Sequence, residues 1–234
     1  MNSAGRQMTD IQNAFADPQM VAKYTEGPPR FVPGYNSMLS MAAILLAERA
    51  REDARILVLG AGGGLEMKAF AQVQPRWSFD GVDPSAAMLD LAKQTLGPLA
   101  SHAHLHQGYI DGAPEGPFDG ATCLLTLHFV DVEERLRIAS EIRRRLKPGA
   151  PFVAAHFSIP GDHHERPLWL SRYSAFLAAS GVEPDKAAAA RKAVDGQLSI
   201  LAPEQDEVIL RDAGFSDPTL FYAGFTFRGW VAYA

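Results

Sequence analysis

The chain has 234 residues, of which 47% are hydrophobic and 21% charged, as is typical of a globular protein with a sizeable core. Its net charge of −5 argues against broad nucleic-acid binding, and no apolar run reaches the roughly eighteen residues of a membrane span. The N-terminal sequence lacks the charged and then apolar pattern of a secretory signal, and the single cysteine, Cys123, offers no disulfide framework. These features predict a cytoplasmic protein.

The first segment, residues 1–36, is predicted to form an N-terminal arm. Residues 1–30 are polar, contain three prolines and allow at most one short helix, near residues 9–24. The sequence RFVPGY at residues 30–35 predicts a turn that leads into a helix over 37–51. The arm therefore precedes the folded domain and is positioned to cover part of it.

Residues 37–234 are predicted to form one α/β domain in which strands and helices alternate. This alternation favours right-handed crossovers and a doubly wound, Rossmann-like sheet of seven strands. The connection Ala223–Gly224 is too short for anything but a hairpin, so the last strand is expected to run antiparallel. A helical insertion at about 161–213 precedes this hairpin. The expected strands are 56–60, 77–82, 102–107, 118–126, 151–157, 219–222 and 225–233, and the expected helices are 37–51, 65–74, 85–96, 132–146, 164–180, 184–198 and 203–213.

A glycine-rich turn follows the first of these strands, in the sequence RILVLGAGGGLEMKAF at residues 55–70. Gly60, Gly62 and Gly64 alternate, and the absence of a Cβ at these positions lets main-chain N–H groups approach a ligand. The spacing matches neither the dinucleotide pattern G-x-G-x-x-G nor the Walker pattern. What remains is G-x-G-x-G, the pattern of enzymes that use S-adenosylmethionine (SAM), with a plain strand–helix connection as the alternative.

An acidic residue, Asp83, ends the second strand about 20 residues beyond the glycines. A carboxylate at this place can accept hydrogen bonds from two ribose hydroxyls. Pro84 follows it and suits the first position of a helix, so Asp83 can also serve as a helix N-cap. We therefore expect Asp83 and Pro84 to border the nucleotide.

With these motifs placed, residues 37–234 resemble the class I SAM-dependent methyltransferases. LKPGAPFVAA at 146–155 is similar to the family's entry into its fifth strand, and LTLHFVDVEER at 125–135 to the segment that lines its methyl-transfer cleft. The resemblance implies a SAM cofactor and a small-molecule methyl acceptor. The family usually has an acid where this chain has Val58 and another where it has Tyr109, so here the main chain of Tyr109 and Ile110 is expected to hold the adenine.

A narrower resemblance points to the carboxy-SAM synthases of the tRNA wobble-uridine pathway. It rests on RFVPGY at 30–35 and LLAER at 45–49. These enzymes share the methyltransferase fold and use prephenate to convert SAM to carboxy-SAM. Their arginine for the added carboxylate corresponds to Arg191 here, for which an ordinary exposed helical arginine is the alternative. The narrower resemblance therefore implies carboxy-SAM as a second candidate ligand.

His128, just past the fourth strand, is the candidate general base, because ligands bind at that edge of the sheet and histidine titrates near neutrality. A histidine that only packs beside the next helix is the alternative. Trp169, Arg172 and Tyr173 recur at helical spacing in the insertion and either line a pocket for an aromatic or carboxylate acceptor or face the core.

Arg30 and Tyr35 are expected either to close over the cofactor as a lid or only to anchor the arm. No metal site is predicted: His102, His104 and His106 share a strand face without an acidic or cysteine partner, and His163–His164 reads as a surface loop. The sequence therefore predicts a methyltransferase that acts on a small molecule. A carboxy-SAM synthase-like enzyme, a non-catalytic SAM-binding protein and a homodimer stay open as alternatives.

Overall fold

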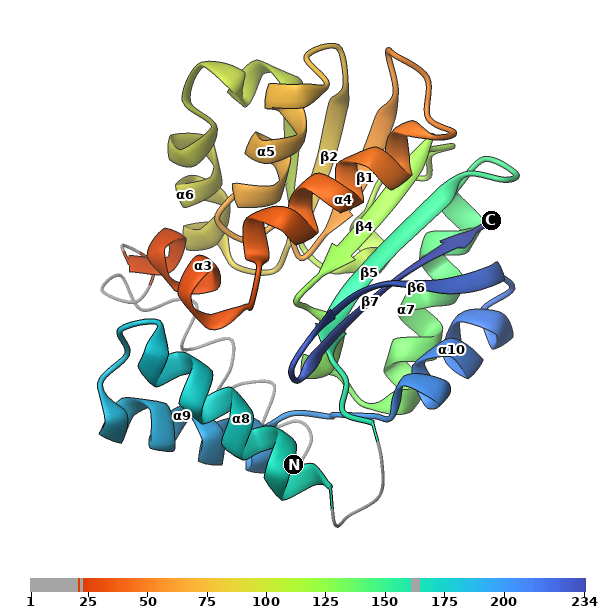
Figure 1. Ribbon diagram of the computed structural model, residues 1–234. Coiled ribbons are helices and arrows are strands. Elements are labelled where there is room, and N and C mark those ends of the chain that lie inside the picture. Colours follow the sequence, from red (N-terminus) through yellow and green to blue (C-terminus); the bar gives the residue numbers. More distant parts are fainter. Residues whose placement is uncertain (1–20, 22, 161–164) are drawn as a thin grey trace.

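The computed structural model describes residues 21, 23–160 and 165–234, and its centre is a mixed sheet of seven strands in the order β3-β2-β1-β4-β5-β7-β6 (Figure 1). All neighbouring pairs are parallel except those of β7, which runs antiparallel to β5 and β6. This confirms the predicted fold class. The strands are β1 (Arg55–Leu59), β2 (Ser78–Asp83), β3 (Ala103–Gln107), β4 (Gly120–Leu124), β5 (Pro151–Phe157), β6 (Ser216–Gly224) and β7 (Phe227–Tyr233).

Helices cover both faces of the sheet, as a doubly wound fold requires. Figure 1 shows α4 (Tyr35–Ala47), α5 (Leu65–Val73) and α6 (Ala86–Leu96) on one face, with α7 (Val132–Arg145) and α10 (Pro203–Asp212) on the other. Short 3-10 turns join several elements: η1 (Tyr24–Glu26), η2 (Gly97–His102), η3 (Ile110–Gly112) and η4 (Leu127–Phe129). The sheet therefore lies between two helical layers.

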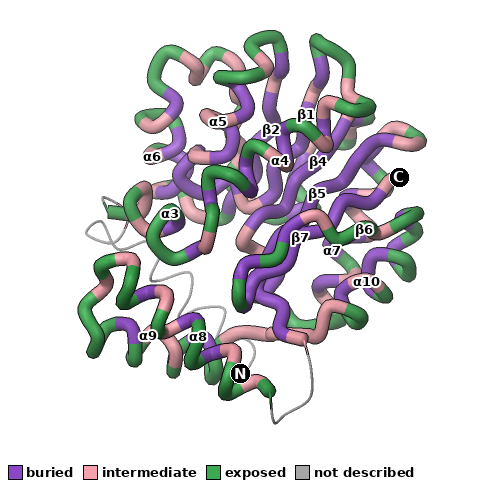
Figure 2. The backbone as a smooth tube through the Cα atoms, in the orientation of Figure 1, coloured by how far each residue is buried: buried purple, intermediate pink, exposed green. Residues whose placement is uncertain are grey.

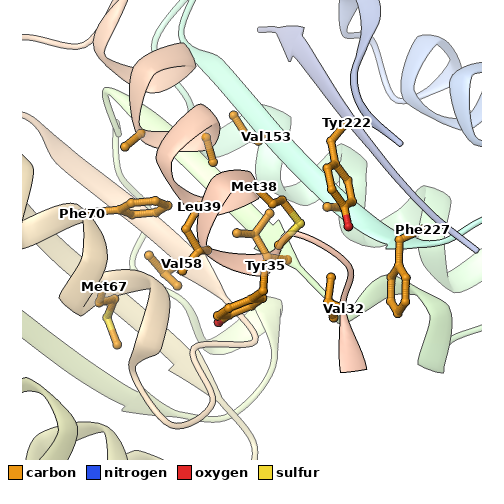
Figure 3. Packing of buried hydrophobic residues seen from close by; sticks show 14 of the residues in the cluster. Val32, Tyr35, Met38, Leu39, Val58, Met67, Phe70, Val153, Tyr222 and Phe227 are labelled. Carbon is orange, nitrogen blue, oxygen red and sulfur yellow. The ribbon is translucent and has the colours of Figure 1, made fainter. Parts of the chain in front are cut away.

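The central strands are buried on both sides, so neighbouring residues enter different cores (Figure 2). Val58 packs into the cluster under α4 and α5, whereas Leu57 and Leu59 enter the cluster under α7 and α10. Figure 3 shows part of the first cluster, with Met38 from α4 and Val153 from β5 among its members. This double burial accounts for the continuous apolar runs that identified the strands.

A third group of helices lies beyond the carboxyl ends of β4 and β5 (Figure 1). It comprises α3 (Gly27–Phe31), α8 (Arg166–Ala179) and α9 (Pro184–Gln197). Hydrogen bonds connect the segment after α9 to the sheet edge: Ile159 donates its N–H to the carbonyl of Leu201 at 3.0 Å. The arm and the helical insertion thus meet over the same edge of the sheet.

Three local expectations differ from the structure. The predicted strand at 118–126 is shorter, because the chain turns into η4 after Leu124. The hairpin turns at Phe225–Thr226 and not at Ala223–Gly224, which pair with β7. Phe225 adopts φ +48° in this turn, but an apolar aromatic residue is typical of a strand, so the sequence did not indicate the turn there. A short helix, α3, forms where a turn was expected from residue 30, with proline at its first positions. The predicted helix at 9–24 lies almost entirely outside the described residues.

Candidate functional site

A cavity of about 960 Å³ lies at the C-terminal edge of the sheet. The ends of β1 to β4 contribute to its wall, at the point where the strand order reverses between β1 and β4. Ligands of open α/β sheets bind at this switch point. The volume is at the upper end of the roughly 300–1,000 Å³ found for small-molecule sites, which leaves room for a second small molecule beside a nucleotide.

The glycine-rich turn forms the part of the cavity next to β1. Gly60 and Gly62 line the cavity, and a Cβ at Gly60 would overlap the hydroxyl of Thr126 at the end of β4. Gly64 does not line it. At φ +78°, Gly64 begins α5, and a Cβ there would lie 2.9 Å from Cα of Ala92 in α6. Gly64 therefore has a packing role, in which it lets two helices approach, and its role in cofactor binding stays a prediction.

Asp83 fastens the glycine turn to the next helix. Its Oδ2 accepts a hydrogen bond from the N–H of Gly62 and its Oδ1 one from the N–H of Ser85, both at 2.9 Å. Ser85, not Asp83, is the N-cap of α6, because its side chain accepts from the N–H of Met88. Burial raises the pKa of Asp83, and the two backbone hydrogen bonds oppose that rise. Each carboxylate oxygen keeps a lone pair for a ligand, and Pro84 lines the cavity beside it.

The end of β3 supplies the next part of the wall. Tyr109 is 46% exposed and Ile110 is buried, and both line the cavity. Asp111, the acid nearest to them in sequence, instead pairs with Arg137 of α7 at 2.7 Å. Arg137 also pairs with Glu134 at 2.6 Å, so both carboxylates at this end of the cavity are engaged by one guanidinium.

His128 lies on the cavity wall after β4 and is 3% exposed. Burial lowers its pKa well below the ordinary value, and the neighbouring His156 and Arg135 lower it further. Its Nδ1 accepts a hydrogen bond from the N–H of Phe157 at 3.4 Å. A neutral imidazole whose Nδ1 accepts carries its proton on Nε2. The cavity therefore meets a neutral ring that offers a donor, which argues against the predicted general-base role.

The backbone beside His128 is strained. Leu125, which also lines the cavity, has φ +58°, a conformation that costs a branched residue about 1–3 kcal/mol. The N–H of Leu125 bonds the carbonyl of Ala155 at 2.6 Å, which holds the turn against β5. In this conformation the chain carries Thr126 next to the glycine turn, where its hydroxyl would overlap a Cβ at Gly60.

Residues 56–149, which contain the glycine turn, Asp83 and His128, match the family model of a methyltransferase domain. This stretch is a class I SAM-dependent methyltransferase domain. It is 26% identical over 227 residues to a carboxy-S-adenosyl-L-methionine synthase from Chromohalobacter salexigens, covering 95% of this chain and 84% of that protein. The relationship is distant but extends over nearly the full length.

Solved structures share the fold at lower identity. Human N-acetylserotonin methyltransferase, solved in complex with SAM, superimposes with a TM-score of 0.62 at 15% identity, covering 94% of this chain and 57% of that one. The cyclase SpnF superimposes with a TM-score of 0.59 at 19% identity, covering 80% of this chain and 59% of that one. The chain thus spans little more than half of these structures, and the likeness concerns the fold alone.

The N-terminal arm reaches the cavity through residues other than those predicted. Tyr24, Pro28, Phe31 and Val32 line the cavity. Arg30 is exposed and lies 3.5 Å from Glu26, and Tyr35 is buried in the core under α4 (Figure 3). Neither lines the cavity, because α3 turns its apolar side toward the sheet edge and its arginine toward solvent.

The helical insertion contributes one predicted residue to the cavity wall, Tyr173 of α8. Trp169 and Arg172 do not line it; the guanidinium of Arg172 lies 4.5 Å from the Trp169 ring. Arg191 of α9 is half-buried and also lies outside the lining. Helical spacing placed Trp169 and Tyr173 on one stripe, but only one of them reaches the ligand space.

Five aromatic residues of the cavity wall were not among the predicted site residues: Tyr24, Phe31, Phe129, Phe157 and Phe227. Phe157 ends β5 and Phe227 begins β7, so both were assigned to strand cores. A signal was available for Phe157, since it ends a parallel strand at the edge where ligands bind.

Two buried polar groups stabilise the surroundings of the site. Glu66 of α5 accepts a hydrogen bond from the Thr122 hydroxyl at 2.6 Å; burial raises its pKa to about 8, against the effect of that bond. On the other face, Arg135 of α7 donates to Asp206 of α10 at 2.5 Å and to the carbonyl of Ser199 at 2.6 Å. The Ser199 N–H in turn bonds the carbonyl of His128 at 3.0 Å.

Within the described residues there is no group of three or more His, Cys, Asp and Glu side chains that could hold a metal ion, and His163 and His164 lie outside them. His106 instead pairs with Asp80 at 2.9 Å, and His102 bonds the carbonyl of Trp77 at 3.2 Å. None of the described helices combines the length and the apolarity that a bilayer crossing requires.

Proposed function

We propose that this protein transfers the methyl group of SAM to a small molecule bound in the same cavity. The observation that carries the proposal is the continuity of the cavity. One space joins the glycine turn and Asp83 to a chamber beyond β5, whose wall includes Phe157, Tyr173 and Phe227. A cofactor and an acceptor can therefore lie side by side, which is the main requirement of a reaction that depends on alignment.

The residues near β1 to β3 fit SAM. Gly60 and Gly62 leave main-chain space where a side chain would intrude, and Asp83 keeps lone pairs for ribose hydroxyls. Tyr109 and Ile110 offer the wall for the adenine. When bound, SAM supplies a methyl group already activated by its sulfonium. The protein is left to orient the partners and to exclude water, which the buried walls of the chamber support.

In this scheme His128 is a hydrogen-bond donor. Its Nδ1 is occupied by the Phe157 N–H, and its lowered pKa keeps the ring neutral. His128 lines the cavity, and no hydrogen bond joins its Nε2–H to another described residue. It can hold an acceptor oxygen in place without taking its proton, so the proposed nucleophile is one that reacts with a sulfonium methyl group without a strong base.

A carboxy-SAM synthase is the second candidate, favoured by the 26% identity over nearly the full chain. That reaction uses the dicarboxylate prephenate, and an anion in a buried chamber needs a cationic partner. Among the described lining residues the only cation is Arg137, which Glu134 and Asp111 already engage. This arrangement supports methyl transfer over carboxy-SAM synthesis.

Native mass spectrometry of the freshly purified protein, with the released ligand identified, tests the proposal. SAM or S-adenosylhomocysteine (SAH) is the expected ligand. Carboxy-SAM as ligand, together with its formation from SAM and prephenate by the purified protein, would establish the second candidate. A protein that binds neither SAM nor SAH in titration calorimetry would contradict both, and one that binds SAM without transferring its methyl group across an acceptor panel would be a non-catalytic SAM-binding protein.

A further inference from the structure

The chamber beyond β5 has a wall of aromatic rings that come from distant parts of the chain. The rings of Phe157 and Phe227 lie 4.1 Å apart between centroids, and Tyr173 meets them at 5.4 and 5.9 Å, edge to face with both. Phe31 of α3 also lines the cavity and is 43% exposed. Rings arranged in this way present apolar faces and edges to a planar ligand.

Two polar groups of this chamber have no hydrogen-bond partner among the described residues. One is Nε2 of His128 and the other is the hydroxyl of Tyr173, a side chain that is 4% exposed. Burial raises the pKa of Tyr173, so its hydroxyl stays protonated. The His128 ring packs edge-on against Phe157, with 5.1 Å between the ring centroids. Tyr173 packs edge-on against the same ring, so Phe157 contacts both polar side chains. Both side chains line the cavity, so a ligand there is in position to hydrogen-bond them.

The described residues offer the chamber no free charge. Among the described residues that line the cavity, the charged ones are Asp83, Glu134 and Arg137, which belong to the nucleotide end. Arg172 and Arg228 are the sequence neighbours of Tyr173 and Phe227, but their guanidinium groups lie over the Trp169 ring, at 4.5 and 5.5 Å, and neither lines the cavity. A carboxylate or ammonium in the chamber would lose its hydration without gaining a partner.

We propose that the methyl acceptor is an uncharged aromatic molecule with a hydroxyl or carbonyl oxygen, seated against Phe157, Tyr173 and Phe227 and hydrogen-bonded by Tyr173 and His128. This inference rests on the proposed function and specifies its substrate class. The ring of the acceptor packs against the three aromatic side chains. Its oxygen accepts hydrogen bonds from the two polar groups, and its neutrality suits a wall in which the described residues provide no free cation.

The test compares two probes of the same shape, 2-naphthol, which is neutral at pH 7, and 2-naphthoate, which is anionic. The full-length protein is first titrated with SAH and then, saturated with SAH, with each probe in a calorimeter. We expect 2-naphthol to bind at least about tenfold more tightly than 2-naphthoate. The variant Tyr173→Phe, which loses only the hydroxyl, should weaken 2-naphthol binding by about threefold to tenfold.

Tyr222→Phe is the matched control, because that buried hydroxyl bonds the carbonyl of Pro33 and does not line the cavity. It should leave both probe affinities unchanged. Equal or tighter binding of 2-naphthoate or prephenate to the SAH-loaded protein, or no binding of 2-naphthol, would overturn the inference while the proposed function stands. Unchanged 2-naphthol affinity in Tyr173→Phe would contradict the proposed hydrogen bond between the Tyr173 hydroxyl and the acceptor. Failure to bind SAH in the first titration would instead count against the proposed function, and this inference would fall with it.

Discussion

The N–H of Gly62 donates a hydrogen bond to Asp83 across 21 residues of sequence, at 2.9 Å. The same carboxylate accepts from Ser85, so one side chain joins the turn after β1 to the start of α6. The two motifs that predicted a nucleotide site are therefore parts of one hydrogen-bonded unit. A change at Asp83 acts on the shape of the glycine turn as well as on the cofactor.

Replacement of Asp83 by alanine is expected to weaken SAH binding by on the order of 100-fold, because charged hydrogen bonds contribute about 1.5–3 kcal/mol each. The SAH affinity of Asp83→Asn should lie between those of the wild type and Asp83→Ala, since the amide nitrogen cannot accept a hydrogen bond from one of the two N–H donors. Titration calorimetry measures both. Asp90→Ala, which removes an exposed carboxylate of α6, is the control. Wild-type affinity in Asp83→Ala would refute the assignment of the nucleotide site.

Gly64→Ala is expected to destabilise the fold more than it weakens SAH binding. Its Cβ would lie 2.9 Å from Cα of Ala92, and such overpacking costs about 1–3 kcal/mol beyond the backbone strain. Gly34→Ala shares the left-handed backbone conformation, at φ +66° and ψ +30°, but meets no atom within 4 Å, so it reports the strain alone. Urea denaturation should rank Gly64→Ala as the less stable variant. If SAH affinity fell as far in Gly64→Ala as in Gly62→Ala, Gly64 would be a cofactor residue after all.

His128 should make the protein less stable in acid. Its folded pKa is well below the ordinary 6.5, so below that pH the unfolded chain takes up a proton that the folded chain refuses. The free energy of unfolding then falls as the pH falls, by up to about 1.4 kcal/mol per pH unit. Denaturation at pH 5 to 8 measures this, and His128→Asn should flatten the acid limb. A substitution at the exposed His104 serves as the control, and equal acid sensitivity in His128→Asn would show that another group is responsible.

Glu66 should have the opposite effect at the alkaline side. Its pKa rises from 4.5 to about 8 on folding, so the folded chain keeps a proton that the unfolded chain has lost. This contribution is complete below pH 4.5 and is lost as the pH rises toward about 8, by up to about 1.4 kcal/mol per unit. Glu66→Gln keeps an acceptor for Thr122 and should gain stability over the wild type with rising pH. A constant difference between the two proteins from pH 5 to 8 would contradict a protonated Glu66.

The pair of Arg135 and Asp206 is fully buried, so removal of one partner leaves an uncompensated charge. Arg135→Met or Asp206→Asn should each lower the free energy of unfolding by about 3–5 kcal/mol. The double variant Arg135→Met with Asp206→Leu should recover much of this loss. Arg211→Met breaks an exposed pair on the same helix and should cost less than about 1 kcal/mol. Urea denaturation measures the free energy of unfolding of all four variants. Equal losses for Arg135→Met and Arg211→Met would contradict a larger contribution from the buried pair.

Much of the candidate site could be predicted because its signals are local. Gly60, Gly62 and Asp83 follow strands that the apolar runs made visible, and the structure brings all three to one cavity. Arg30 and Tyr35 show the limit of such reasoning. They stand in a recognisable motif, yet the orientation of α3 and α4 turns one toward solvent and the other into the core.

The sequence by itself determined the doubly wound sheet, the antiparallel final strand and the nucleotide motifs, because hydrophobic periodicity and glycine placement act over a few residues. Only the tertiary structure decided which side chains enclose the ligand space. Phe31, Phe157, Tyr173 and Phe227 come from four separate elements, and their meeting depends on how the arm and the insertion pack over the sheet edge. The donor role inferred for His128 was decided there too, since it follows from a hydrogen bond to the end of another strand and from burial.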